Sequence, residues 1–178
     1  MGGSIGVEGR LEFSFDNSWT ALKWDADPAY LEGLHRAAEG TRAVDILGVL
    51  NGSSVWLIEV KDPRGARISF RSTRARLPEV VSTKVRDTIA ALTWVHGRVS
   101  SAGIPHLIRV LFGARSKERT VLLWLEDAAP GYALALKEEI GRELRWLNPR
   151  VLVTNRALFR QDDVPGLTVT SLKGAHTP

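Results

Sequence analysis

The chain has 178 residues, an apolar fraction of 44% and six tryptophans, enough for one domain with a buried core. No apolar run is long enough for a membrane-spanning helix, and the N-terminal stretch lacks the charged start and apolar centre of a secretory signal. The absence of cysteine excludes disulfides and thiolate zinc sites, and we expect a cytoplasmic protein. The formal net charge of +4 is modest, so its distribution says more than its size.

The first predicted elements are short. Residues 1–9 are rich in glycine and predict a loose tail. Alternation over Leu11–Phe15 predicts a strand, and residues 19–24 predict a second extended piece. Asp27 followed by Pro28 is typical of a helix start, so we expect a helix over residues 28–39.

A β-hairpin is predicted over residues 43–61. Residues 44–50 and 55–60 are apolar runs of the length and composition of strands. Residues 51–53 between them have turn chemistry, because Gly52 can adopt a positive φ without steric cost.

The loop length decides which side chains share a face of this hairpin. A three-residue loop places Asp45 directly opposite Glu59 and puts both on the face of Lys61, whereas a two-residue loop places the carboxylates on opposite faces. Two facing carboxylates on an apolar surface repel each other and lose hydration. A divalent cation such as Mg²⁺ removes both costs, because it prefers oxygen ligands. Acids, a cation and a lysine are the groups needed to hydrolyse a phosphodiester.

This pattern resembles a known enzyme family. Asp45, then thirteen residues, then Glu59-Val60-Lys61 is similar to the motif of the PD-(D/E)XK nuclease superfamily, the fold of many restriction endonucleases. The resemblance implies that Asp45, Glu59 and the backbone carbonyl of Val60 bind Mg²⁺ or Mn²⁺. It implies that Lys61 activates the attacking water and offsets phosphate charge. Val44 precedes the aspartate where the family pattern has proline. The alternative is an ordinary hairpin whose Glu59 and Lys61 mark a strand end in water.

The flanking helices offer further candidates by the same resemblance. The helix before the hairpin often adds an acid to the metal site, and Glu32 or Glu39 could supply it. The helix after the hairpin often adds a polar residue, for which Lys84 is the candidate. The alternative for each is an ordinary solvated helix position.

A basic segment follows the predicted site. Residues 64–86 contain a single acid, Glu79, so their charge is strongly biased. Arginine matches phosphate oxygens, so this segment predicts a nucleic-acid-binding surface, with a solubilising loop as the alternative. Its basic residues are Arg64, Arg67, Arg71, Arg74, Arg76, Lys84 and Arg86.

The remaining elements alternate in type. Strands are expected at residues 66–70, 106–112, 120–125, 150–154 and 167–172, helices at 78–99 and 130–147, a surface loop at 157–166, and a frayed end at 174–178. This order predicts an α/β (α+β) fold in which helices flank a mixed central β-sheet. The resemblance implies a restriction-endonuclease-like αβββαβ core over residues 28–126. Within a single domain spanning residues 1–178, residues 127–172 would elaborate that core.

The function implied by the resemblance is a metal-dependent nuclease that hydrolyses phosphodiester bonds of DNA, in defence or repair. The alternatives are a non-catalytic nucleic-acid-binding or scaffold module of the same fold, and a nuclease acting on RNA. Nucleic acid is the expected partner, and no membrane is expected. A homodimer, a targeting partner protein, sequence specificity and the choice between endo- and exonuclease all stay open at this point.

Overall fold

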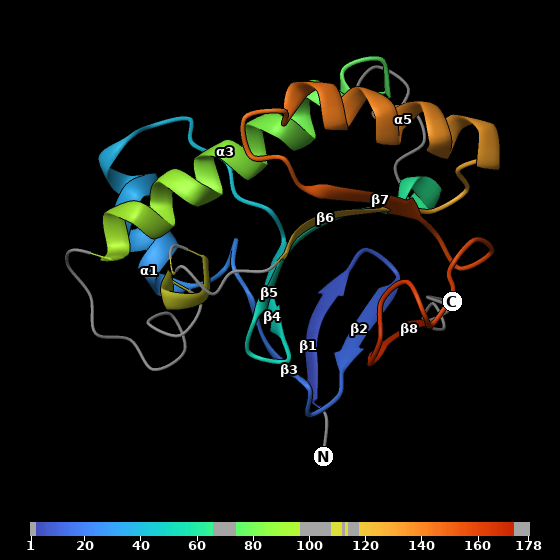
Figure 1. The fold of residues 1–178 in the computed structure, drawn as a ribbon, viewed down its shortest axis with the longest axis horizontal. Coiled ribbons are helices and arrows are strands. Elements are labelled where there is room, and N and C mark those ends of the chain that lie inside the picture. Colours follow the sequence, from blue (N-terminus) through green and yellow to red (C-terminus); the bar gives the residue numbers. More distant parts are fainter. Residues whose placement is uncertain (1–2, 66–73, 97–107, 112, 114–117, 173–178) are drawn as a thin grey trace, which may run out of the picture.

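Two β-sheets packed face to face organise the chain in a computed structural model (Figure 1). The structure describes residues 3–65, 74–96, 108–111, 113 and 118–172. The larger sheet is mixed and has the order β3-β4-β5-β6-β7, formed by Trp19–Lys23, Ile46–Leu50, Ser54–Lys61, Glu118–Leu125 and Arg150–Thr154. The smaller sheet is antiparallel and has the order β1-β2-β8, formed by Gly3–Glu8, Leu11–Phe15 and Leu167–Ser171.

Helices cover the opposite face of the larger sheet. The long helices α3 and α5 run along this face, and α1 packs beside α3 (Figure 1). The helical segments are α1 (Pro28–Tyr30), η1 (Leu31–His35), η2 (Pro63–Gly65), α3 (Leu77–His96) and α5 (Pro130–Glu143). No helix among the described residues has the length and apolar character needed to cross a membrane. The predicted α/β class with a mixed sheet is confirmed, but helices cover only one face of that sheet, and the unpredicted smaller sheet covers the other.

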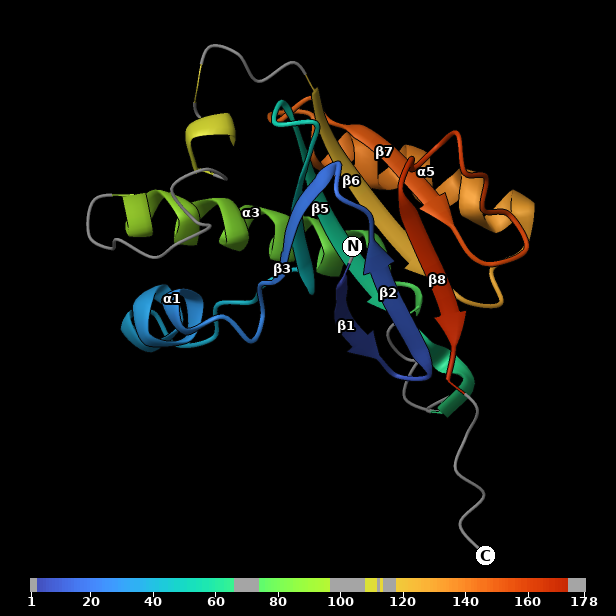
Figure 2. The same ribbon diagram turned by 90° about the horizontal axis from the view of Figure 1, so that it is seen from below.

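The larger sheet separates two apolar cores because its side chains alternate between faces. The core on the helix side contains Leu47, Val49, Val55 and Leu57 together with the buried side chains of α3. The other face packs against the smaller sheet, as Figure 2 shows from below. That second core is rich in aromatic rings, namely Phe13, Phe15, Trp19, Trp56 and Trp124.

The predicted hairpin is confirmed as β4 and β5. Leu50 pairs with Ser54 across a three-residue loop, in which Asn51 and Gly52 have φ values of 50° and 65°. The pairs Leu47 with Leu57 and Val49 with Val55 follow from that register. The helix start at Asp27 is also confirmed, because its carboxylate accepts a hydrogen bond of 2.8 Å from the Ala29 N–H.

Two element predictions were wrong. Residues 3–8 of the predicted tail form strand β1, which pairs with β2 despite its glycines. Residues 108–111 of the predicted strand 106–112 are helical, and Ile108, Val110 and Leu111 are buried. A short buried apolar run shows no readable period, so sequence alone did not separate helix from strand there. The strand predicted at residues 66–70 and the frayed end at 174–178 lie outside the described residues.

Candidate functional site

The register of the hairpin brings Asp45 and Glu59 together. Ile46 pairs with Ile58, so Asp45, one residue earlier, lies across from Glu59. Both side chains emerge on the face that carries Leu47 and Leu57, which is the face covered by α3. Asp45 is 5% exposed and Glu59 is fully buried. The three-residue loop therefore places Asp45 and Glu59 opposite each other on one face of the hairpin, as predicted from the sequence.

Each oxygen of Asp45 has a partner. Oδ2 accepts a 2.7 Å hydrogen bond from the backbone N–H of Val60, which fixes the carboxylate against strand β5. Oδ1 lies 3.2 Å from Nζ of Lys84, which reaches down from α3. Because the N–H and C=O of one strand residue point to the same neighbour, the Val60 carbonyl is directed toward the same strand edge as Asp45.

Two lysines surround the Glu59 carboxylate. Nζ of Lys84 donates a 2.9 Å hydrogen bond to Oε2 and lies 2.8 Å from Oε1. Nζ of Lys61 lies 2.5 Å from Oε1. Oε1 accepts no hydrogen bond. Its negative charge is offset only by the nearby ammonium groups of Lys61 and Lys84. Asp45, Glu59, Lys61 and Lys84 form what we call the charged cluster.

Burial dominates the electrostatics of the charged cluster. Desolvation, followed by repulsion from Asp45, raises the pKa of Glu59 to about 7, although Lys61 and Lys84 act in the opposite direction. Desolvation works to lower the pKa of Lys84, but attraction to Glu59 and Asp45 outweighs it, so that pKa is raised. The cluster thus keeps the Lys84 ammonium group charged beside a Glu59 carboxylate that holds its proton more tightly than usual.

A second acidic group adjoins the first. Carboxylate oxygens of Glu8, Asp25 and Asp45 all lie within 4.8 Å of one another. Nζ of Lys23 forms an ion pair with Glu8 and lies 3.1 Å from Oδ1 of Asp25. Desolvation is the largest cause of a raised pKa at Glu8. These donors could also hold a cation.

The sequence prediction missed Glu8 and Asp25. Glu8 fell in the stretch expected to be a tail, and nothing in its surroundings indicated otherwise. A signal for Asp25 existed, because Lys23 at the end of β3 pairs with Ile46 at the start of β4. Pairing the predicted strand at 19–24 with the hairpin would have placed Asp25 near Asp45.

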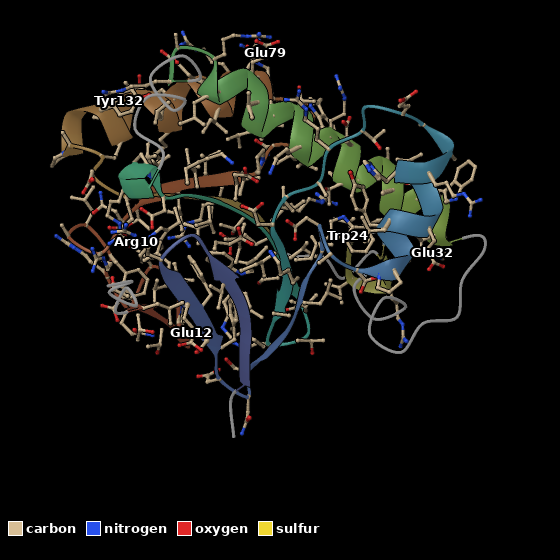
Figure 3. The ribbon with its side chains drawn as sticks, turned by 180° about the vertical axis from the view of Figure 1, so that it is seen from behind. Arg10, Glu12, Trp24, Glu32, Glu79 and Tyr132 are labelled. Carbon is tan, nitrogen blue, oxygen red and sulfur yellow. The ribbon has the colours of Figure 1, made fainter. Side chains whose placement is uncertain are left out.

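The helix acids proposed from the resemblance lie elsewhere. Glu32 and Glu39 are both exposed, and Figure 3 shows Glu32 at the periphery of the molecule. Neither belongs to the group of described carboxylates that lie within 4.8 Å of one another, which consists of Glu8, Asp25 and Asp45 and does not include Glu59 either. Lys84, in contrast, reaches the charged cluster from the helix where it was expected.

The predicted basic surface is largely engaged in intramolecular contacts. Arg64 pairs with Asp62, Arg76 with Glu79, and Arg86 with Asp87. The Arg74 guanidinium lies 4.1 Å from the ring centre of Tyr132. Arg67 and Arg71 lie outside the described residues. Among the described basic residues of this segment, Arg74, Arg76 and Arg86 are exposed.

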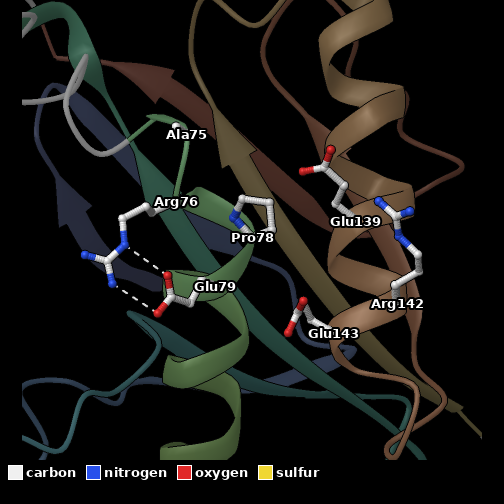
Figure 4. A pocket seen from close by; sticks show the side chains of 7 residues that line it. All are labelled: Ala75, Arg76, Pro78, Glu79, Glu139, Arg142 and Glu143. Atoms are coloured by element: carbon white, nitrogen blue, oxygen red, sulfur yellow. Dashed lines mark hydrogen bonds and ion pairs between the residues drawn. The ribbon is translucent and has the colours of Figure 1, made fainter.

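A separate charged pocket lies between the start of α3 and helix α5 (Figure 4). Its volume is about 460 Å³, and an ion pair between Arg76 and Glu79 forms one wall. The other lining residues are Ala75, Pro78, Glu139, Arg142 and Glu143. Asp45, Glu59 and Lys61 are not among the residues that line this pocket.

Comparisons with protein-family models, curated proteins and solved structures found no match to this chain.

Proposed function

We propose that this protein is a divalent-metal-dependent nuclease that hydrolyses phosphodiester bonds of DNA, with Asp45, Glu59 and Lys61 as its catalytic residues. The observation that carries the proposal is the meeting of two buried carboxylates from neighbouring strands beside ammonium groups. Such a pair costs folding free energy through desolvation and repulsion. An apolar pair at the same positions would avoid that cost, so a cation-binding role explains the arrangement better than packing does.

The donor set fits Mg²⁺ or Mn²⁺. Asp45, Glu59 and the Val60 carbonyl offer only oxygen atoms, which hard divalent cations prefer. The hydrogen bond from the Val60 N–H orients the Asp45 carboxylate without using its second oxygen. When bound, the cation would supply Lewis acidity and lower the pKa of a coordinated water.

Lys61 is the residue placed to act on the reacting groups. Its side chain is 26% exposed while Glu59 beside it is fully buried, so Lys61 connects the carboxylate to solvent. From there its ammonium can orient the attacking water and offset the charge that develops on the phosphate. Glu59 holds Lys61 in place through their 2.5 Å contact.

We also propose the restriction-endonuclease-like core for this fold. The antiparallel strands β3, β4 and β5 are followed by α3 and by β6, which pairs in parallel with β5. This arrangement supports the αβββαβ pattern, with one departure. The helical segment beginning at Pro28 lies between β3 and β4 in sequence, rather than before all three antiparallel strands.

The test is cleavage of supercoiled and linear DNA, double- and single-stranded, in Mg²⁺, Mn²⁺ or EDTA. We expect cleavage that requires the metal and falls at least ~100-fold in Asp45→Asn and in Lys61→Ala. Glu32→Gln is the matched control, because Glu32 is an exposed acid on a helix, and it should keep full activity. Cleavage that persists in Asp45→Asn, or in EDTA, would refute the assignment. Cleavage of an RNA substrate, measured under the same conditions, shows whether the enzyme acts on DNA, on RNA or on both.

A non-catalytic nucleic-acid-binding module is the second candidate. Full burial of Glu59 favours it, because a carboxylate without exposed surface is poorly accessible to a metal ion and its water. Salt-dependent DNA binding without cleavage in either metal would support this reading over the enzyme.

A further inference from the structure

Lys84 lies where a cation bridging the two catalytic carboxylates would be expected. Its Nζ is 3.2 Å from Asp45 Oδ1, 2.9 Å from Glu59 Oε2 and 2.8 Å from Glu59 Oε1. It thus contacts both acids at once, whereas the only acid within ion-pair distance of Lys61 among the described residues is Glu59. The position between the carboxylates is therefore filled by a side chain of the protein itself.

The charge balance shows why this matters for a metal. Two ionised carboxylates, Asp45 and Glu59, face two ammonium groups, Lys61 and Lys84, so the charged cluster is neutral when all four are ionised. Adding a divalent cation while both lysines stay in place would create a net positive charge in a buried site. Positive charges at these distances repel one another strongly in a protein interior.

Lys84 is the lysine that can leave. It belongs to helix α3 rather than to the strands that carry the carboxylates, and its side chain is 16% exposed. Four rotatable methylene groups allow its ammonium to move several ångströms without displacing the helix.

We propose that Lys84 is a resident counter-ion of the charged cluster and that a divalent cation binds there by displacing its ammonium from Asp45 and Glu59. Lys84 therefore weakens metal binding while it keeps the metal-free protein folded. This inference rests on the proposed metal-dependent function and adds to it a residue that opposes binding of the ion.

The first test measures Mn²⁺ affinity by calorimetry at pH 8 in the full chain and in Lys84→Met. Methionine is neutral, unbranched and of similar length, so it removes the charge with little change in shape. We expect at least about tenfold tighter binding, because the ion no longer has to displace an ammonium group that is attracted to both carboxylates. Unchanged or weaker binding in Lys84→Met would overturn the inference. Lys84→Gln, which keeps a hydrogen-bond donor, should show the same tightening and serves if the methionine variant unfolds.

Two controls locate the effect. Lys23→Met removes the ammonium paired with Glu8 and Asp25, and should change Mn²⁺ affinity less than Lys84→Met does. A larger effect at Lys23 would overturn the inference, since it would place the ion at the other acids. If Asp45→Asn binds Mn²⁺ as well as the parent chain, or if the parent chain and both Lys84 variants bind none, the proposed function itself fails. Binding that depends on Asp45 but is not tightened at Lys84 rejects the counter-ion role alone.

The second test needs no substitution. Acylation of lysines by an N-hydroxysuccinimide ester, read by mass spectrometry, reports how accessible each ammonium group is. Saturating Mg²⁺ should raise the labelling rate of Lys84 several-fold relative to that of Lys137, an exposed lysine of α5. A rate at Lys84 that Mg²⁺ leaves unchanged or lowers would contradict displacement.

Discussion

Glu59 carries the largest electrostatic cost at the residue scale. It has no exposed surface, and its repulsion with Asp45 adds to the loss of hydration. Its carboxylate is compensated by lysines from its own strand and from α3, which links the site to the packing of the helix on the sheet.

The raised pKa of Glu59 predicts a pH-dependent stability. The folded-state pKa of about 7 lies above the ordinary value of 4.5, so the folded chain binds this proton more tightly than the unfolded chain. Stability from this group is fully present below pH 4.5 and is lost as the pH rises to about 7. Without metal, the free energy of unfolding of the parent chain minus that of Glu59→Gln should fall across this range by on the order of 3 kcal/mol. The free energies of unfolding are measured by urea denaturation in EDTA at each pH. If those of the parent chain and of Glu59→Gln change in parallel with pH, the prediction is contradicted.

At the element scale, the hairpin needs a glycine in β4. A Cβ at Gly48 would lie 2.9 Å from two ring carbons of Trp19, closer than carbon atoms pack. Trp19 itself packs between Phe15 and Trp56, with ring centres 4.9 and 5.3 Å away, so it has little room to move. The close approach of β3 and β4 therefore depends on this residue.

Gly48→Ala should destabilise the protein by about 1–3 kcal/mol, the usual cost of overpacking a core. Gly141→Ala is the matched control, because Gly141 is in helix α5 and a Cβ there meets nothing within 4 Å. That control should be stabilising by roughly 0.5–1 kcal/mol. Thermal unfolding of both variants gives the comparison, and a neutral Gly48→Ala would show that Trp19 yields easily.

The hairpin was predictable from sequence because its signals are local. The turn at residues 51–53 sets the register, and the register sets which face Asp45 and Glu59 share. Strand β1 gave no such signal, because its glycine-rich residues acquire strand structure only by pairing with β2. For the same reason Glu8 could not be placed near Asp45. The basic segment was visible in the sequence, but the pairing of Arg64, Arg76 and Arg86 with acids depends on side-chain contacts that composition does not reveal.

At the scale of the whole molecule, the three neighbouring carboxylates of Glu8, Asp25 and Asp45 come from both sheets. Glu8 ends β1 of the smaller sheet, Asp25 follows β3, and Asp45 precedes β4 of the larger sheet. Under the proposed function, a cation bound at Asp45 would lie where residues of the two sheets meet, so we expect binding to stabilise the entire fold rather than one loop.

Mg²⁺ should accordingly raise the unfolding temperature of the parent chain. At a metal concentration 100 times the dissociation constant, the gain is about 2.7 kcal/mol if the unfolded chain does not bind the ion. Asp45→Asn should show no gain at that concentration. Na⁺ at matched ionic strength separates site binding from general screening, and an equal shift in parent and variant would contradict a site at Asp45.

The most direct measurement is the position of Mn²⁺ in crystals of the full chain, from anomalous scattering. The account predicts one ion within about 2.2 Å of oxygens from both Asp45 and Glu59, with the Lys84 ammonium moved away. An ion found only elsewhere, or no ion at saturating Mn²⁺ with Lys84 still between the two carboxylates, would contradict it.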